Sequence, residues 1–323
     1  MRALQVINFT SAPEIRQVPA GKSGENQLKV VIEACGLNFA DLLMMKGTYQ
    51  DTPEPPFTMG LEVCGRVIEV GASVTHVKIG DRVAIFAGSG GLATEGVFDA
   101  DRAVKVPDTM SPSEAAGFQV AYGTSHLALT RRARLAAGET LVVLGAAGGV
   151  GLTAVEIGAA LGARVIAVAR GADKLAVAKK AGAHHLIDSE ETDIRTALKD
   201  LGGVDVVYDP VGGDQFKPAL RACKPEARIL TIGFASGEVP PVPANILLVK
   251  NIDVIGFYWG GYLAFAPEVL RQSMADLFAL YENGQLRPHI SHEIPFEDAV
   301  SALELLRSRK ATGKVVVTMP APA

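Results

Sequence analysis

Apolar residues form six short runs in the middle of the chain, at residues 141–144, 165–169, 185–187, 204–208, 228–232 and 252–256. Runs of this length are typical of strands buried on both faces of a parallel sheet. Segments with helical periodicity separate them, and we expect helices to begin near residues 150, 173, 192 and 214. Strands that alternate with helices predict an α/β fold with a doubly wound sheet of six strands.

The flanking regions have a different pattern. Strand-like runs such as Gln27–Ala34 and Cys64–Val70 lie between turns rich in glycine and proline, and a short helix is expected at Asn38–Lys46. This pattern predicts an antiparallel, β-rich domain. After residue 258 we expect two helices, around 267–282 and 297–309, and a last strand, Lys314–Thr318, that returns to the first domain. The predicted domains are therefore 1–118, 119–258 and 259–323, the last being the second part of the first.

A glycine-rich turn follows the strand at 141–144 and opens a helix. Helix N-termini bind phosphates because their backbone N–H groups are unpaired and carry partial positive charge. Gly148 would let the backbone approach a pyrophosphate, and Gly151 would let the helix pack closely on the strand. Ala146 takes the first place of the G-x-G-x-x-G pattern, so an ordinary tight turn is the alternative. The flanking strands and helix favour a dinucleotide site at Gly145, Gly148, Gly149, Val150 and Gly151.

The end of the second strand indicates which dinucleotide binds. NAD sites usually have an acidic residue there, which holds the ribose 2′-hydroxyl. Here the strand is followed by Arg170, with Lys174 close behind, while Asp173 is expected to cap the next helix. Positive side chains suit the 2′-phosphate of NADPH, and a carboxylate would repel it. We therefore predict NADPH as the cofactor.

Composition narrows the function classes. The 323 residues are 48% hydrophobic and 20% charged, which is typical of a globular protein, and the net charge of −4 argues against nucleic-acid binding. No apolar stretch is long enough to span a bilayer, and the N-terminal residues lack the apolar core of a secretion signal. The three cysteines, Cys35, Cys64 and Cys223, form no CxxC pair, which favours a reducing compartment. We expect a cytoplasmic protein with no membrane partner.

Several motifs together resemble one known family, the zinc-independent quinone oxidoreductases of the medium-chain dehydrogenase/reductase superfamily. The motifs span nearly the whole chain: Cys35–Asp41, Pro56–Gly65, Gly80–Val83, Val120–Thr124, Gly145–Gly151, Asp209–Gly213 and Asn245–Gly260. The resemblance implies a six-stranded Rossmann domain inserted in a split GroES-like catalytic domain. It also implies NADPH as hydride donor and a quinone or related enone as acceptor.

The resemblance also assigns candidate site residues. Asn38 would donate a hydrogen bond near the nicotinamide ribose or the acceptor oxygen, or it would only cap its helix. Tyr49 would lie in the catalytic cleft, or would be a half-buried aromatic at its rim. Thr124, Gly233 and Phe257 complete the cofactor-binding set that the family implies. Family analogy further suggests a homodimer, formed by pairing of the strand 252–256 across a two-fold axis.

A zinc ion is not expected. Zinc in this superfamily is held by Cys and His, but the matching places here carry Asn38, Leu61 and Ala116. The histidines of His289-Ile-Ser-His292 are expected at the surface. Without a Lewis acid, hydride transfer to an activated acceptor is the favoured chemistry. A 2-enoyl-thioester reductase is the alternative enzyme, and a structural or RNA-binding relative is the non-enzymatic one.

Overall fold

A computed structural model describes residues 1–321, which form two compact units: Met1–Val120 together with residues from Pro288 onward, and Ala121–Arg287. The unit boundaries thus lie at 120/121 and 287/288, whereas the sequence suggested 118/119 and 258/259. Residues 259–287 belong to the second unit because they bond within it. Ser273 Oγ lies 2.8 Å from His126 Nδ1, and the Arg287 amide donates to Glu156 Oε1.

The second unit contains a six-stranded sheet in the order β11-β10-β9-β12-β13-β14. All five strand pairs are parallel. The strand bounds are β9 Thr140–Leu144, β10 Arg164–Ala169, β11 His185–Asp188, β12 Val204–Asp209, β13 Cys223–Thr231 and β14 Asp253–Gly256. This is the strand order of a doubly wound dinucleotide-binding fold, so the predicted fold class is confirmed.

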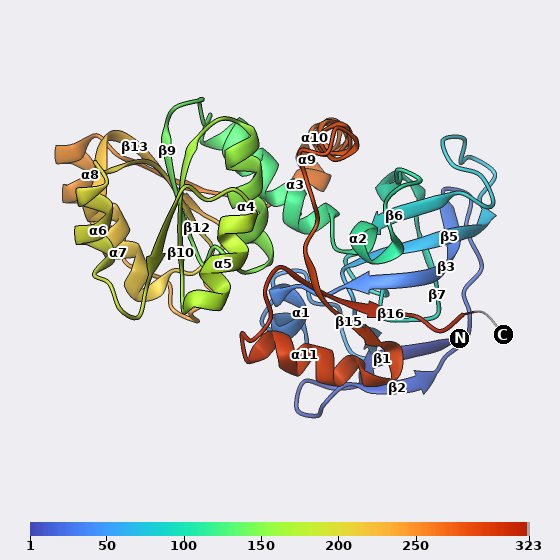
Figure 1. The fold of residues 1–323 in the computed structure, drawn as a ribbon. Helices are drawn as coiled ribbons and strands as arrows, with labels where there is room; N and C mark the ends of the chain where they lie inside the picture. The colour runs from blue at the N-terminus through green and yellow to red at the C-terminus, as the bar shows by residue number, and fades with distance from the viewer. Residues whose placement is uncertain (322–323) are drawn as a thin grey trace. The chain divides into compact units, whose positions relative to one another are not determined.

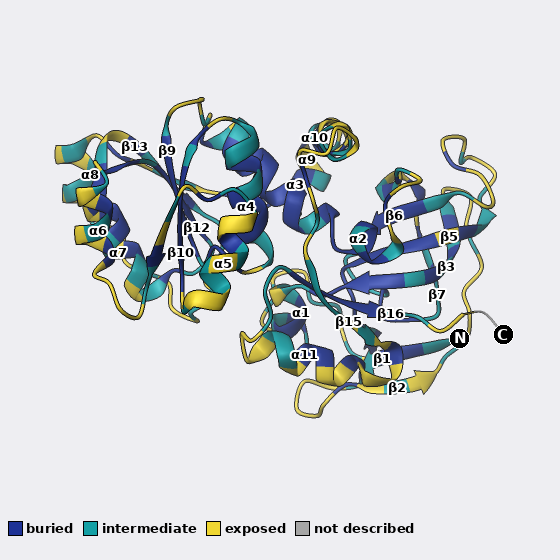
Figure 2. Ribbon diagram, viewed as in Figure 1, coloured by how far each residue is buried: buried dark blue, intermediate teal, exposed yellow. Residues whose placement is uncertain are grey.

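Helices cover both faces of this sheet. In Figure 1, α4 and α5 lie on one face and α6, α7 and α8 on the other. The central strands are dark blue in Figure 2, whereas the outer surfaces of the helices are yellow. The helix bounds are α3 Gln119–Leu127, α4 Gly149–Ala160, α5 Ala172–Lys180, α6 Ile194–Asp200, α7 Phe216–Ala222, α8 Ala244–Lys250, α9 Tyr262–Phe265 and α10 Pro267–Glu282. A π-helical turn, Ala128–Arg132, follows α3.

The first unit is built from two sheets. A three-stranded sheet has the order β2-β1-β4, and a seven-stranded sheet has the order β15-β16-β3-β5-β6-β8, with β7 also paired to β3. The bounds are β1 Arg2–Val6, β2 Glu14–Gln17, β3 Gln27–Gly36, β4 Phe57–Thr58, β5 Glu62–Val70, β6 Arg82–Phe86, β7 Glu95–Asp99, β8 Ala103–Lys105, β15 Ile290–Pro295 and β16 Lys314–Thr318. Short helices α1 Phe39–Met44, α2 Pro112–Ala116 and α11 Ala299–Arg307 complete the unit.

The strand β3 shows why this unit folds as a sheet. Leu28, Val30 and Ile32 are buried and alternate with partly exposed residues, which is the period of two that a strand requires. These side chains join a core that also contains Leu4 and Ile85.

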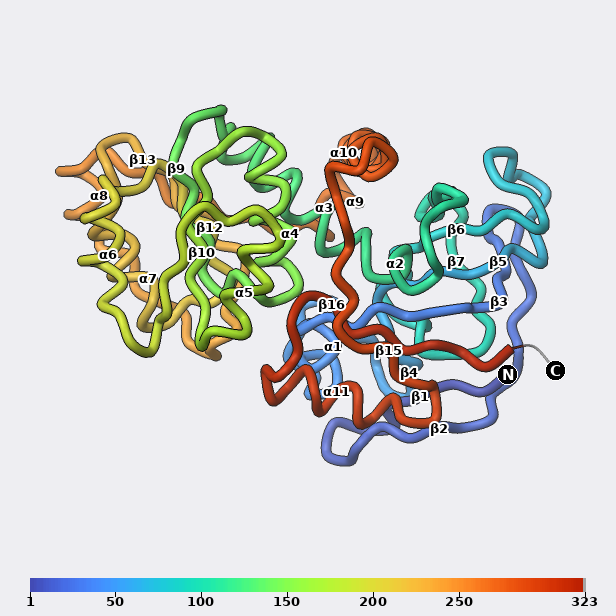
Figure 3. The backbone as a smooth tube through the Cα atoms, viewed as in Figure 1, coloured from blue at the N-terminus to red at the C-terminus, as the bar shows by residue number. Residues whose placement is uncertain are grey.

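The last strand returns to the first domain, as the sequence indicates. In Figure 3 the red β16 runs beside the blue β3, and Val316 pairs with Gly36 in antiparallel register. The pair β15–β16 is the one parallel pair among the strands described in this unit. A parallel pair needs a crossover, and α11 supplies it. None of the helices within residues 1–321 has the length and apolar character that crossing a bilayer requires.

Candidate functional site: a dinucleotide turn and a buried polar cluster

The glycine turn joins the most buried strand of the second unit to a helix. Every residue of β9 is buried, and β9 lies between β10 and β12, where the strand order reverses. Ligands of doubly wound sheets bind at this switch point, outside the carboxyl ends of the strands. The first backbone bond of α4 runs from Leu152 N to Gly148 O, so the amides of Gly149, Val150 and Gly151 precede the helical ladder. No side chain caps this helix end.

The glycines of the turn have different roles. A Cβ atom at Gly151 would lie 2.2 Å from Gly145 O, so the close approach of helix and turn requires glycine there. Gly145 has a φ of +59° and fills a left-handed position. Gly148 is exposed and extended, and a Cβ atom there would meet only Gly145 O, at an ordinary 3.4 Å. The space beyond Gly148 is therefore open to a ligand.

A second loop borders this turn at the end of β12. The buried Asp209 carboxylate accepts hydrogen bonds from the amides of Val211 and Gly212, both at 2.8 Å. Burial raises the pKa of Asp209 above its usual range, and these two amides partly oppose the rise. Val211 packs beside Gly145, since a Cβ added there would meet its Cγ2 at 2.8 Å. Asp209 thus shapes the edge of the site, a role that its motif alone did not reveal.

The end of β10 carries the predicted basic residues. Arg170 is exposed, and its Nη1 lies 3.9 Å from Glu190 Oε1, while Lys174 lies half-buried in the first turn of α5. An acid is nevertheless close: Asp188, at the end of β11, accepts a hydrogen bond of 3.0 Å from the Gly171 amide. The sequence placed no acid here because Asp188 comes from the neighbouring strand.

Two other cofactor candidates of this unit, Gly233 and Phe257, follow strands at the same edge of the sheet, and a third, Thr124, belongs to α3. Gly233 follows β13, and its amide donates to Asp209 O, while the buried Phe257 follows β14. Thr124 is buried in α3, next to Ser125. Ser125 is a supporting residue that sequence reasoning missed, because its Oγ donates to Val150 O at 2.9 Å and ties α3 to the first turn of α4.

The first unit places Asn38 in a buried polar cluster. Lys314 Nζ donates to Leu37 O at 2.7 Å, to Asn38 Oδ1 at 2.8 Å and to Glu62 Oε1 at 2.8 Å. Asn38 Nδ2 donates to Glu62 Oε1 at 2.9 Å and to Gly36 O at 3.3 Å. Both amide hydrogens of Asn38 are therefore used inside the protein.

Asp41 is a further residue that bonds to Asn38. Asp41 Oδ2 accepts a hydrogen bond of 2.8 Å from the backbone N–H of Asn38, and the backbone N–H of Asp41 donates to the backbone carbonyl of Asn38 at 3.0 Å. Burial raises the pKa of Asp41 to about 7, and burial also raises the pKa of the Cys35 thiol.

Tyr49 is half-buried against the core of this unit, and its carbonyl accepts from Thr52 Oγ1 at 2.7 Å. The geometry of its own unit thus places Tyr49 at the edge of the core.

The residues at this cluster do not fit a zinc ion. Leu61 and Ala116 are buried and apolar, and Asn38 offers an amide rather than a thiolate or an imidazole. Among the described residues, no group of three or more His, Cys, Asp or Glu side chains is arranged to hold a metal. The point between the oxygens of Leu37, Asn38 and Glu62 is filled by the Lys314 ammonium.

Elemental analysis tests this mismatch. We expect the purified protein to contain less than stoichiometric zinc, and we expect dialysis against a chelator to leave its thermal midpoint and its activity unchanged. The reason is that zinc sites need Cys or His ligands, and Asn38, Leu61 and Ala116 supply neither. One zinc per chain, lost together with activity on chelation, would contradict this expectation.

Family models match both units. An alcohol dehydrogenase GroES-like domain matches residues 24–108, and a zinc-binding dehydrogenase model matches residues 149–279. Together with the split β-rich unit and the doubly wound sheet, these matches define a medium-chain dehydrogenase/reductase. The second model is described as zinc-binding, whereas Asn38, Leu61 and Ala116 do not offer the Cys and His ligands that zinc prefers.

Comparison with individual relatives identifies the family within this superfamily. The chain is 40% identical to the quinone oxidoreductase-like protein 2 homolog of Nematostella vectensis, over 91% of this chain and 82% of the relative. The Escherichia coli quinone oxidoreductase, solved in complex with NADPH, superposes with a TM-score of 0.90 at 30% identity over 98% of this chain and 100% of that one. A mycobacterial protein, also complexed with NADPH, superposes with a TM-score of 0.92 at 30% identity over the same shares. The chain belongs to the quinone oxidoreductase family of this superfamily.

Proposed function

We propose that this protein is an NADPH-dependent reductase that transfers hydride to quinones or related enones without a metal. The observation that carries the proposal is the open end of α4, where Gly148 leaves room for a pyrophosphate and the first amides of the helix face it. Two structural relatives complexed with NADPH support the cofactor.

The chain's own residues bind and orient the reactants in this proposal. The amides of the α4 N-terminus hold the pyrophosphate, and Arg170 and Lys174 hold the 2′-phosphate. Thr124, Gly233 and Phe257 border the rest of the cofactor. NADPH supplies the hydride when bound, so the protein contributes placement and exclusion of water.

The acceptor needs little activation, which is why we favour quinones. The reduced oxygen of a quinone is stabilised by conjugation and takes its proton from water or from a hydroxyl group. Asn38 and Tyr49 are the residues that we assign to the acceptor side. The strongest acid–base candidates of the first unit, Asp41 and Glu62, are almost fully buried, which removes them from contact with an acceptor.

A steady-state assay of NADPH oxidation tests the proposal. We expect turnover with 1,4-benzoquinone and 1,4-naphthoquinone that exceeds turnover with enoyl-CoA thioesters. Turnover with the thioesters alone would assign the enoyl-thioester reductase alternative. NADPH binding with no turnover of either class would favour a non-enzymatic role, and the absence of NADPH binding would reject the proposal.

The assignment of the 2′-phosphate to Arg170 makes a quantitative prediction. Arg170→Ala should raise the dissociation constant for NADPH and leave that for NADH nearly unchanged, because only NADPH carries the phosphate. A hydrogen bond to a charged group contributes about 1.5–3 kcal/mol, which is roughly ten- to a hundred-fold in affinity. Fluorescence titration of both cofactors measures the two constants.

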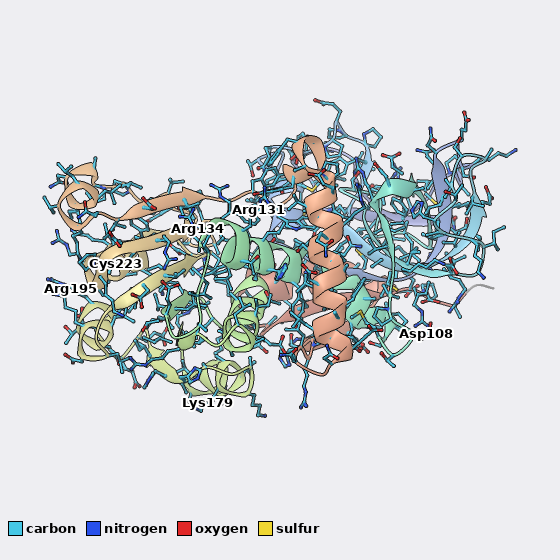
Figure 4. The ribbon with its side chains drawn as sticks, turned by 90° about the horizontal axis from the view of Figure 1, so that it is seen from above. Asp108, Arg131, Arg134, Lys179, Arg195 and Cys223 are labelled. Atoms are coloured by element: carbon cyan, nitrogen blue, oxygen red, sulfur yellow. The ribbon has the colours of Figure 1, made fainter. Side chains whose placement is uncertain are left out.

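The chain offers matched controls for this variant. Arg195 and Lys179 are exposed basic residues of the same unit, and Figure 4 shows both at its periphery, on α6 and α5. Arg195→Ala should leave both dissociation constants unchanged. Equal losses of NADH and NADPH affinity in Arg170→Ala would assign Arg170 a structural role instead.

We also propose a homodimer formed through the edge strand β14. This strand ends the six-stranded sheet, and an unpaired edge favours pairing with a second copy. The adjacent helix α8 exposes Leu248 and Val249, at 78% and 76% of their surfaces. Sedimentation velocity should give a dimer, and Leu248→Glu with Val249→Glu should shift it to a monomer. A wild-type monomer at micromolar concentration would refute this proposal.

A further inference from the structure

The ion pair of Lys314 and Glu62 is buried beside Asn38. The side chains of Lys314 and Glu62 are 7% and 1% exposed, and Lys314 Nζ lies 2.8 Å from Glu62 Oε1. The ammonium has three N–H groups, and its three partners are Leu37 O, Asn38 Oδ1 and Glu62 Oε1. Every donor of the Lys314 ammonium is therefore directed inward.

These partners dictate the orientation of the Asn38 carboxamide. A lysine ammonium can only donate, so it must face Oδ1, whereas an ionised carboxylate can only accept, so it must face Nδ2. Rotating the amide by 180° would bring two donors about 2.8 Å apart and two acceptors about 2.9 Å apart, the distances of the present bonds. Such contacts between buried polar groups are unfavourable, and the pair excludes the flipped amide.

The rest of the cluster holds Glu62 in place. Its second oxygen, Oε2, accepts from the Val120 amide at 2.9 Å, at the start of α3. Gly36 packs closely here, since a Cβ atom there would lie 2.3 Å from the Ala116 carbonyl oxygen and 3.0 Å from Glu62 Oε1. The carboxylate is thus bound from three sides and cannot turn to follow the Asn38 amide.

We propose that Lys314 and Glu62 are positioning residues that fix the Asn38 carboxamide with Oδ1 as its one remaining hydrogen-bonding atom, so that Asn38 accepts a hydrogen bond from a hydroxyl group of the bound reactants. Both N–H groups of Asn38 are already bonded to Glu62 and Gly36, whereas Oδ1 retains a second lone pair. The inference rests on the proposed function, because it takes Asn38 to be in contact with the bound reactants. It replaces a donor role for Asn38 with an acceptor role.

The test removes the pair without leaving a buried charge. Lys314→Met combined with Glu62→Gln deletes both charges and nearly keeps the side-chain volumes, a change that buried ion pairs often tolerate. The Val120 N–H would hold the oxygen of the introduced glutamine, so that its NH2 group faces Asn38 and no longer favours Nδ2 on that side. We expect kcat/KM for NADPH and 1,4-naphthoquinone to fall about ten-fold, the equivalent of one net hydrogen bond. In an Asn38→Ala background, the same double substitution should change kcat/KM less than about two-fold.

Two measurements distinguish whether the cofactor or the acceptor carries the hydroxyl group. A weaker NADPH dissociation constant in the double variant assigns the hydroxyl to the cofactor ribose. A higher KM for the quinone at an unchanged NADPH dissociation constant assigns it to the reduced acceptor. Equal losses in the wild-type and Asn38→Ala backgrounds, or no loss in the wild-type background, would overturn the inference.

A second variant distinguishes acceptor from donor and preserves the charge balance. Asn38→Asp with Glu62→Gln keeps one carboxylate beside Lys314 and retains an acceptor oxygen at position 38, but removes its N–H groups. We expect this variant to keep more activity than Asn38→Ala; activity equal to that of Asn38→Ala would overturn the acceptor role. If the wild-type protein binds NADPH but does not oxidise it with any acceptor tested, the proposed function fails.

In that case the NADPH dissociation constant is measured for the Lys314→Met/Glu62→Gln variant in the wild-type and Asn38→Ala backgrounds. If the effects of the double substitution and of Asn38→Ala are additive, Lys314 and Glu62 do not act through Asn38 and the inference is overturned.

Discussion

Gly148→Val is expected to abolish NADPH binding while leaving the fold intact. The backbone of Gly148 is extended, with φ −79° and ψ 174°, a conformation that valine adopts readily. Its added Cβ would touch only Gly145 O at 3.4 Å, so the branched side chain would extend into the open space where the pyrophosphate is proposed to lie. We expect the dissociation constant for NADPH to rise by at least about 10²-fold, because the pyrophosphate would lose hydrogen bonds that contribute about 1.5–3 kcal/mol each. Fluorescence titration and a thermal midpoint measured without cofactor provide the two readouts.

Gly151→Ala, three residues further on, is the contrasting variant. A Cβ there would lie 2.2 Å from the Gly145 carbonyl oxygen, which belongs to the backbone and cannot move aside easily. We therefore expect Gly151→Ala to lower the thermal midpoint, whereas Gly148→Val should not. If Gly148→Val unfolds the second unit, or if it binds NADPH as tightly as the wild type, the assignment of the turn is wrong.

The sheet of the second unit could be predicted because its signal is local. Each apolar run lies between glycines or helical segments, and the strands begin within one residue of the predicted positions, except β13, which begins at Cys223 instead of residue 228. The early start escaped prediction because Lys224, Pro225 and Glu226 are polar or helix- and strand-breaking residues. Parallel strands buried on both faces leave little freedom in their composition, which is why the pattern is readable.

Elements defined by tertiary contacts were not predictable. The helix α8 was missed because its exposed Leu248 and Val249 interrupt the helical pattern of one apolar face. The placement of residues 259–287 with the second unit depends on contacts such as His126 with Ser273, which lie 147 positions apart. Similarly, Asp188 reaches the end of β10 only because β11 pairs beside it.

The polar cluster around Asn38 illustrates the same limit at the candidate site. The sequence suggested that Asn38 caps a helix, on the evidence of its neighbours along the chain, or that it donates a hydrogen bond, as the family resemblance implies. It could not identify Lys314 as a partner, because Lys314 and Glu62 are separated by 252 positions. A lysine at the start of a terminal strand is usually solvated, so nothing in its local pattern indicated burial.

Lys314→Met is expected to have the largest effect on stability. The substitution keeps most of the side-chain volume but leaves the Glu62 carboxylate, which is 1% exposed, without its cation. Removing one partner of a buried ion pair typically costs about 3–5 kcal/mol, because the remaining charge is buried without hydration and without a counter-ion. Urea unfolding, followed by circular dichroism, should show a lower unfolding midpoint for the transition of the first unit.

A surface ion pair of the same length gives the matched control. Lys224 Nζ lies 2.8 Å from Asp205 Oδ2, as Lys314 Nζ does from Glu62 Oε1, but the side chains of Lys224 and Asp205 are 39% and 23% exposed. Lys224→Met should therefore cost no more than about 1 kcal/mol, because water replaces the lost partner. Adding Glu62→Gln to Lys314→Met should restore most of the lost stability, since it removes the orphaned charge. If Lys314→Met and Lys224→Met lower the free energy of unfolding by similar amounts, burial does not determine how much the Lys314–Glu62 pair contributes to stability.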